Sequence, residues 1–274
     1  MSFTRIRANT IATLSRNVLE KISRQAARGQ LALSTGKRIN STMDDASGFS
    51  LARNMEARRR GLTQALANIG NAESLLNTAA GSYDVINAMV IKIKELVVQG
   101  ADDAFSPVQR IAVQGQIDAL VEEIDDTIST ATFQGLVLLD GTYTGKRFQT
   151  GASAGETTVI NLSDVRSSAL ALAGIDVSSN ATASVALTQV DDALLTLQLG
   201  MQGTGELIMR FQSKMVSTQA QITSVEAARS RVEDIDYAAE QMRMSRIRLV
   251  QQSGFTSMQK ALVAPRQVLS LIAQ

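Results

Sequence analysis

The sequence contains no cysteine and no histidine among its 274 residues. Without cysteine it forms no disulfide, no thiolate metal site and no cysteine nucleophile. Without histidine it lacks the His-based catalytic triads, most zinc sites and the side chain best suited to proton transfer near neutral pH. These two absences exclude many classes of enzyme before any motif is considered.

Aromatic residues and prolines are also scarce: seven Phe, three Tyr, no Trp, and two prolines at Pro107 and Pro265. Hydrophobic residues still make up 45% of the chain, so the apolar side chains are mainly aliphatic. Such a composition is typical of long helices packed side by side. Because proline interrupts helices, we expect a kink or a brief break at Pro265 and few other interruptions of this kind.

Long apolar runs are missing as well. No stretch of about 18 apolar residues is present, so no transmembrane segment is predicted. The first 20 residues mix arginines with scattered apolar residues and lack the continuous apolar core of a secretory signal. We expect a protein that is cytosolic or leaves the cell by a route that needs no cleaved signal.

Charge is distributed unevenly along the chain. Residues 1–40 carry eight Lys or Arg and one Glu, for +7, and residues 241–274 carry five basic and no acidic residues, for +5. The centre therefore carries −11, because the whole chain carries +1. Basic ends are typical of proteins that bind nucleic acid or an anionic membrane, and also of helices with a solvated or interface face. We favour the last, since no aromatic stacking platform accompanies the charges.

Two long segments repeat apolar residues at alternating intervals of four and three. This is the 3.5-residue period of a coiled coil. Neither stripe can be buried alone, so we expect the two segments to pair antiparallel as a rod. The predicted rod seam comprises Leu62, Leu66, Ile69, Leu76, Ile86, Val90, Ile93 and Val97 with Val190, Leu194, Leu197, Ile208, Phe211, Met215 and Ile222.

A second apolar stripe lies outside this seam and requires a further partner helix or another subunit. It comprises Leu75, Val85, Met89 and Leu96. A helix capped by Ser106 and starting at Pro107 is predicted to run to about Thr130 and to fold back on the long helix. Glycine and threonine recur over residues 131–182, which predicts one or two β-hairpins, with an exposed connection over 167–183. Glycines 200, 203 and 205 are expected where backbones approach closely.

Each end of the chain is predicted to form an amphipathic helix without a long intramolecular seam. These helices cover about residues 3–35 and the chain after 236, and we expect them to assemble with other subunits. Their apolar positions are Ile11, Leu14, Val18 and Ile22 near the N-terminus, and Met242, Leu249, Phe255, Met258 and Leu262 near the C-terminus.

No catalytic constellation is present. The dense carboxylates, Asp44 with Asp45 and the run 122–126, are interpreted as helix starts and a solvated face. The glycines between 141 and 155 lack the Gly-Lys-Ser/Thr ending of a phosphate loop. We predict no enzyme, no cofactor and no metal site.

Several motifs resemble those of bacterial flagellins. Residues 37–48 have the sequence KRINSTMDDASG, similar to the flagellin signature G-x-RINSA-x-DDAAG. Further similar segments are GLTQA at 61–65, KELVVQ at 94–99, FQG at 133–135, FQTG at 148–151, ARSRVEDIDYA at 228–238, QQSG at 251–254 and PRQVLSL at 265–271. The resemblance covers about residues 3–163 and 185–273.

The resemblance implies a structural protein that self-assembles into the helical filament of the bacterial flagellum, outside the cell. It implies a mainly α fold: a long antiparallel helical coiled-coil rod, a small β-hairpin region, and terminal helices in the filament core. The implied domains are 1–41, 42–185, 186–235 and 236–274, with little or no variable outer domain. The implied partners are other copies of the chain, an export chaperone of the flagellar type III pathway, and cap and hook-associated proteins, with neither nucleic acid nor membrane.

Two other functions stay open at this stage. A hook–filament junction protein shares both terminal regions but is an adaptor in few copies. A basic-ended coiled-coil protein that binds nucleic acid or membrane belongs to a different class.

The resemblance also implies recognition by the vertebrate innate receptor for flagellin. The family's contact residues, an Arg, a Leu and a Glu, correspond to Lys92, Leu96 and Gln116. Lysine lacks the planar fork of arginine, and glutamine lacks the charge of glutamate, so recognition is expected to be weakened.

Overall fold

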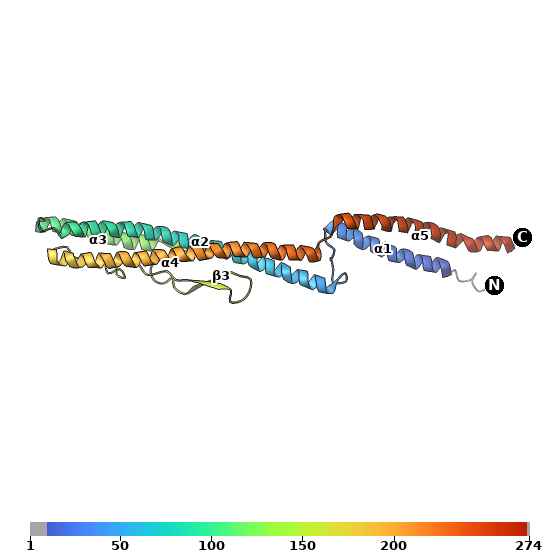
Figure 1. Ribbon diagram of the computed structural model, residues 1–274, viewed down its shortest axis with the longest axis horizontal. Helices are drawn as coiled ribbons and strands as arrows, with labels where there is room; N and C mark the ends of the chain where they lie inside the picture. Colours follow the sequence, from blue (N-terminus) through green and yellow to red (C-terminus); the bar gives the residue numbers. More distant parts are fainter. Residues whose placement is uncertain (1–9, 273–274) are drawn as a thin grey trace. The chain divides into compact units, whose positions relative to one another are not determined.

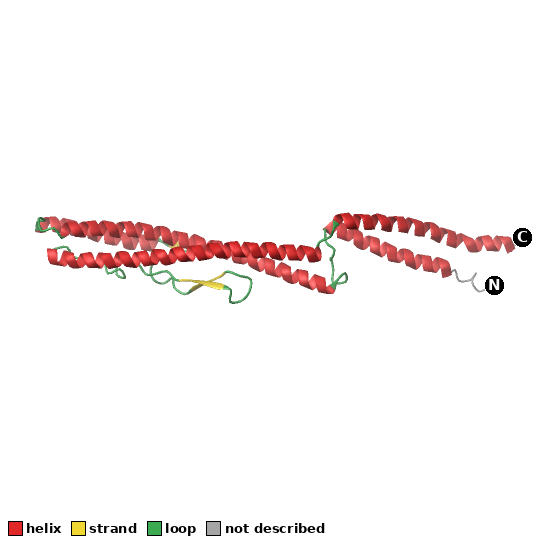
Figure 2. Cartoon of the chain, in the orientation of Figure 1, coloured by secondary structure: helices red, strands yellow, loops and turns green. Residues whose placement is uncertain are grey.

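The computed structural model describes residues 10–272, except the side chains of Ile11 and of residues 264–272 (Figures 1 and 2). The predicted mainly helical fold with a small hairpin region is confirmed. The helices are α1 (Thr10–Thr35), α2 (Ala46–Gly100), α3 (Pro107–Thr130), α4 (Asn180–Glu233) and α5 (Tyr237–Ile272). The strands are β1 (Thr132–Phe133), β2 (Leu136–Val137), β3 (Lys146–Gln149) and β4 (Thr157–Ile160).

The chain divides into two compact units. Unit 1 comprises the residues up to Ala57 and from Val225 onward, and unit 2 comprises Arg58–Ser224. Helices α2 and α4 each contribute residues to both units.

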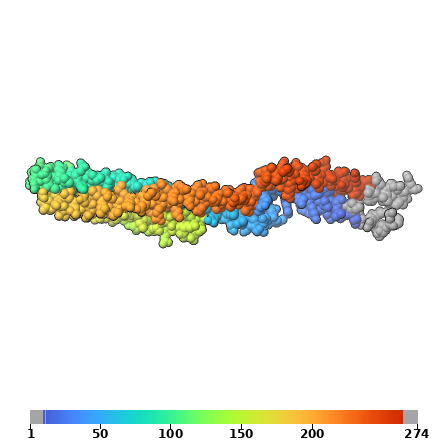
Figure 3. Space-filling model, viewed as in Figure 1, coloured from blue at the N-terminus to red at the C-terminus, as the bar shows by residue number. Residues whose placement is uncertain are grey.

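Unit 2 has a continuous apolar core between α2, α3 and α4. Helices α2 and α4 run antiparallel, as the matching seam periods predict (Figure 1). Tyr83, Ile86 and Ile93 of α2 and Phe211 of α4 have no exposed surface. In the space-filling view, α4 forms an unbroken strip along unit 2, with the hairpin region beside it (Figure 3).

Helix α3 supplies the third partner that the second apolar stripe requires. It starts as predicted: Pro107 occupies its first turn, and the Ser106 side chain accepts from the Gln109 backbone N–H in a capping box. Ile117 and Ile124 point into the same core as Leu75 and Leu96, which are buried. Val85 of that stripe stays exposed.

Two antiparallel hairpins follow α3, as predicted. Strand β1 pairs with β2, and β3 pairs with β4 with Phe148 opposite Thr158. Gly135 has a φ of 80° in the β1–β2 turn, a conformation that glycine adopts without strain. Figure 2 shows the β3–β4 hairpin as strands outside the helices.

The expected exposed connection over residues 167–183 is wrong. Residues 161–179, which we call the strap, bury a side chain at every second or third position, and these are Leu162, Val165, Ser167, Leu170, Leu172, Ile175 and Val177. Side-chain hydrogen bonds from helix α3 hold the strap. The Gln114 amide donates to Ile175 O at 2.7 Å and accepts from Val177 N–H at 3.0 Å. An interval of two and three matches neither the helix nor the strand period, so periodicity alone predicted a loop.

Two smaller expectations are also corrected. Gly200 faces the side chain of Tyr83 rather than a neighbouring backbone, and a Cβ at Gly203 or Gly205 would meet nothing within 4 Å. Helix α5 continues through Pro265, so the brief break expected there is absent, while a kink stays a prediction.

Candidate functional site

The terminal helices α1 and α5 pack side by side in unit 1 (Figure 1). These helices, which were expected to be short of partners within the chain, therefore do pack against each other. Leu19 and Met244 are the most buried side chains of this pair. Two glycines permit the close approach: a Cβ on Gly29 would lie 2.5 Å from Met244 Sδ, and one on Gly254 would lie 2.8 Å from Leu19 Cδ2.

The α1–α5 seam leaves most of the predicted apolar positions facing outward. Leu14 is 65% exposed and Leu249 is 69% exposed. The outward apolar stripe, as we call this set, comprises Leu14, Val18, Met242, Leu249, Phe255 and Leu262. Ile22 and Met258 are half-buried, and the side chain of Ile11 lies outside the described residues. Two glycines thus let the helices pack around Leu19 and Met244, while other large apolar side chains remain available to another molecule.

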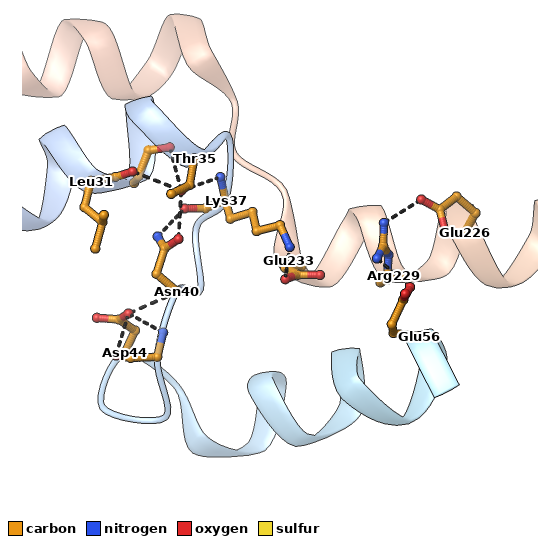
Figure 4. A network of polar contacts seen from close by, with 11 residues as sticks. Leu31, Thr35, Lys37, Asn40, Asp44, Glu56, Glu226, Arg229 and Glu233 are labelled. Atoms are coloured by element: carbon orange, nitrogen blue, oxygen red, sulfur yellow. Dashed lines mark hydrogen bonds and ion pairs between the residues drawn. The ribbon is translucent and has the colours of Figure 1, made fainter. Parts of the chain in front are cut away.

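The two linkers of unit 1 cross next to this helix pair (Figure 4). Lys37 and Asp234 form an isolated antiparallel bridge, with Arg38 N donating to Glu233 O at 2.7 Å. Lys37 Nζ also lies 2.7 Å from Glu233 Oε1, and this carboxylate is largely buried. The segments that resemble the flagellin signatures at 37–48 and 228–238 are therefore in direct contact.

The signature aspartates organise the first linker and the start of α2. Asp44 accepts from the backbone N–H and hydroxyl of Ser41, and the hydroxyl contact lowers the pKa of its carboxyl below the ordinary 3.8. Asp45 accepts from the backbone N–H of Gly48, which lowers the pKa of its carboxyl in the same way. Asp45 is thus the N-terminal cap of α2, in line with the predicted helix start.

A second ion-pair cluster joins α2 to α4 within unit 1 (Figure 4). The Arg229 guanidinium donates to Glu56 at 2.7 Å and to Glu226 at 2.6 Å. None of these three residues was among the predicted site residues. Glu226 and Arg229 lie three residues apart on one helix face, which signals their own pairing, but no local signal indicates Glu56.

Most of the proposed rod seam lies in the apolar core. Ten of its residues are buried, and these are Leu62, Ile69, Leu76, Ile86, Val90, Ile93, Val97, Val190, Leu197 and Phe211. Leu194, Ile208 and Ile222 are half-buried. Leu66 and Met215, also half-buried, line an apolar groove with Val216 and Ala220.

The proposed receptor residues have different surroundings. Lys92 is exposed and its Nζ lies 2.6 Å from Glu95 Oε2. Gln116 is exposed on α3. Leu96 is only 6% exposed, because the unit 2 core covers it.

Within residues 10–272 no helix is long and apolar enough to cross a membrane. The same described residues contain no cluster of three or more acidic side chains arranged to hold a metal ion.

Comparison with known proteins identifies the family of this chain. The family description "Bacterial flagellin N-terminal helical region" matches residues 6–144, and "Bacterial flagellin C-terminal helical region" matches residues 187–272. The flagellin of Halalkalibacterium halodurans is 31% identical over 250 residues, covering 90% of this chain and 92% of the relative.

Two solved structures share the fold. The crystal structure of Bacillus cereus flagellin has a TM-score of 0.51 at 21% identity, covering 60% of this chain and 94% of that one. A putative flagellar hook-associated protein from Vibrio parahaemolyticus has a TM-score of 0.58 at 15% identity, covering 70% and 100%. At these identities the likeness concerns the fold alone.

Long antiparallel helices on a continuous apolar core, with two small hairpins beside them, define a mainly α rod protein. The chain belongs to the flagellin family and is a structural subunit of the extracellular flagellar filament. Its form is minimal, since only residues 145–186, which contain β3, β4 and the strap, lie between the two matched regions.

Proposed function

We propose that the outward apolar stripe of α1 and α5 is the surface through which copies of this chain polymerise. Large aliphatic side chains such as Leu14 and Leu249 are exposed on helices that are already paired with each other. Covering them with another copy would recover about 25 cal/mol for each Å² of apolar surface. The exposure of these large apolar side chains on both terminal helices is the observation that supports the proposal most directly.

Polymerisation assays on Leu14→Gln and Leu249→Gln variants test this surface. Each substitution places an amide on the stripe and leaves the buried α1–α5 seam untouched. We expect the concentration needed for filament growth to rise about tenfold or more, while circular dichroism of the monomer stays unchanged. Leu195→Gln, at an exposed position of α4 in unit 2, is the matched control. Normal growth of both stripe variants would contradict the proposal.

Removal of both terminal helices is a more severe test. Without residues 1–40 and 236–274, unit 2 retains its own apolar core and should stay helical and monomeric. Sedimentation and circular dichroism measure both properties. Filaments grown from this truncated chain would refute a requirement for the terminal helices.

We also propose, from the family membership, export through the flagellar channel and interactions with an export chaperone, the cap and hook-associated proteins. The role is structural rather than catalytic, in keeping with a composition without histidine or cysteine. Pull-down of the monomer with each flagellar partner tests these interactions one at a time.

Weak recognition by the vertebrate innate receptor is a further proposal, centred on Lys92, Leu96 and Gln116. Lys92 is engaged with Glu95, and Leu96 offers little exposed surface. Both features limit the area and charge available to a receptor. The Lys92→Arg, Gln116→Glu double variant should be more potent than the parent in a receptor reporter assay on monomer. Equal potency would contradict the weakening attributed to these two residues.

A further inference from the structure

The methionines of this chain differ sharply in exposure. Met242 on α5 is 67% exposed, whereas Met244, two residues away, is 3% exposed because it packs against Gly29. Met209 on α4 is 64% exposed but belongs to unit 2. The chain thus offers an exposed methionine on the proposed assembly surface, a buried neighbour and an exposed reference elsewhere.

Met242 lines a shallow depression on α5. The depression is lined by Ala238, Gln241, Met242, Ser245, Arg246 and Leu249. Met242 and Leu249 are its two large apolar side chains, and their spacing of seven residues places them on one helix face. The guanidinium of Arg246 is one helical turn from Met242, on the same side of the helix. A polar oxygen on the Met242 sulfur would therefore have a hydrogen-bond donor nearby while the stripe is in water.

We propose that Met242 is a peroxide-sensitive modification site that controls polymerisation through the outward apolar stripe; this rests on the stripe being the assembly surface. The thioether sulfur attacks one oxygen of hydrogen peroxide. A new sulfur–oxygen bond forms, the peroxide oxygen–oxygen bond breaks, and one water leaves. The sulfur loses two electrons and the peroxide gains them. The product, methionine sulfoxide, is polar where the thioether was apolar.

Oxidation changes the polarity of a side chain that becomes buried when the stripe contacts another copy. A thioether adapts to an apolar contact, whereas a polar sulfoxide oxygen must lose its hydration when a neighbouring copy covers it. Oxidation therefore stabilises the free subunit relative to the polymer. In a filament Met242 is covered by a neighbouring copy, so assembled subunits are protected and free subunits are susceptible.

Dose-controlled peroxide treatment of the full-length monomer tests the inference. Peptide mass spectrometry measures sulfoxide at Met242, Met209 and Met244, and sedimentation measures the critical concentration for filament growth. We expect Met242 and Met209 to oxidise well before Met244. We expect the critical concentration to rise about tenfold or more and to return after treatment with methionine sulfoxide reductases.

Two variants assign the effect to one sulfur. Met242→Leu keeps an apolar side chain of similar volume and should remain within about twofold of its untreated critical concentration after peroxide. Met209→Leu should lose polymerisation as the parent does. Equal loss in Met242→Leu, or no loss in the oxidised parent, would overturn the inference, as would equal oxidation of Met242 in preformed filaments and in monomer.

The Leu249→Gln variant separates this inference from the proposal beneath it. If Leu249→Gln fails to polymerise while the oxidised parent polymerises normally, the stripe is the assembly surface and only the role of Met242 is wrong. If both polymerise normally, the stripe itself is not the assembly surface.

Discussion

Gly200 and Gly203 lie three residues apart on α4 but have opposite surroundings. A Cβ on Gly200 would lie 2.9 Å from the ring and hydroxyl of Tyr83, a side chain with no exposed surface, whereas a Cβ on Gly203 would meet nothing within 4 Å. Glycine is required at the first position by packing. At the second it only lowers helix propensity.

Substitution of each glycine by alanine should therefore change stability in opposite directions. Gly203→Ala should raise the free energy of unfolding by about 0.5–1 kcal/mol through helix propensity. Gly200→Ala should lower it by about 1–3 kcal/mol, because the buried Tyr83 ring must shift. Chemical denaturation of the monomer measures both, and a stabilising Gly200→Ala would contradict the packing argument.

Arg110 is a buried cation that supplies hydrogen-bond donors to backbone carbonyl groups in the turn between α2 and α3. Its guanidinium donates to the carbonyl oxygens of Gly100, Asp102 and Phe105, and Asp103 lies 3.6 Å away. Arg110→Met keeps much of the apolar stem but leaves these carbonyls without their donor. We expect a loss of about 2–3 kcal/mol, with Arg110→Lys intermediate. Stability of Arg110→Met equal to the parent would show that water replaces the guanidinium at no cost.

At the scale of elements, the strap and the β3–β4 loop are both irregular but differ in burial. Residues 152–155 of the loop are exposed, whereas the strap buries Leu172, Ile175 and Val177. Each buried aliphatic side chain contributes about 1.5–3 kcal/mol, and lengthening an exposed loop costs only about 0.6 kcal/mol per doubling.

Insertion of Gly-Ser-Gly should discriminate between these two elements. Between Ala154 and Gly155 it should change the free energy of unfolding by less than about 1 kcal/mol. Between Leu172 and Ala173 the insertion breaks the hydrogen bonds of Ile175 and Val177 with Gln114 and moves their side chains out of the core. It should lower the free energy of unfolding by about 3 kcal/mol or more. Denaturant titration compares the two chains, and equal tolerance would mean that the strap does not contribute to the core.

For the whole molecule, the titratable groups predict how stability depends on pH. Hydrogen bonds and ion pairs lower the carboxyl pKa of five aspartates from 3.8, namely Asp44, Asp45, Asp140, Asp164 and Asp176. Their unfolded forms bind protons first as the pH falls, so their stabilisation is complete above about pH 5 and is lost below about pH 4. Burial raises the pKa of Tyr83 above its ordinary 10, so its stabilisation is lost as the pH rises past 10.

Thermal unfolding of the monomer from pH 3 to pH 11 checks this profile. With no histidine in the chain, stability should be nearly constant between about pH 5 and pH 9. Tyr83→Phe should remove part of the alkaline loss and leave the acid loss unchanged. A transition centred near pH 6.5 would contradict the assignment of these groups.

Local patterns were sufficient to predict much of this protein. The period of the apolar residues predicted the long helices and the antiparallel pairing of α2 with α4, and Ser106 with Pro107 predicted the first residue of α3. These features depend on neighbours within a few residues, so the sequence by itself determines them.

Only the tertiary structure decided the features that depend on which helix faces and which distant segments pack together. Gly29 and Gly254 let α1 and α5 pack around Met244 and Leu19, and this leaves other large apolar side chains exposed, such as Leu14 and Leu249. The strap became part of the core because α3 binds it through Gln114 and Asp125. The bridge between Lys37 and Asp234 joins residues almost 200 positions apart. Contacts of this kind have no local period or motif, because their free energy depends on packing between segments that meet only in the folded chain.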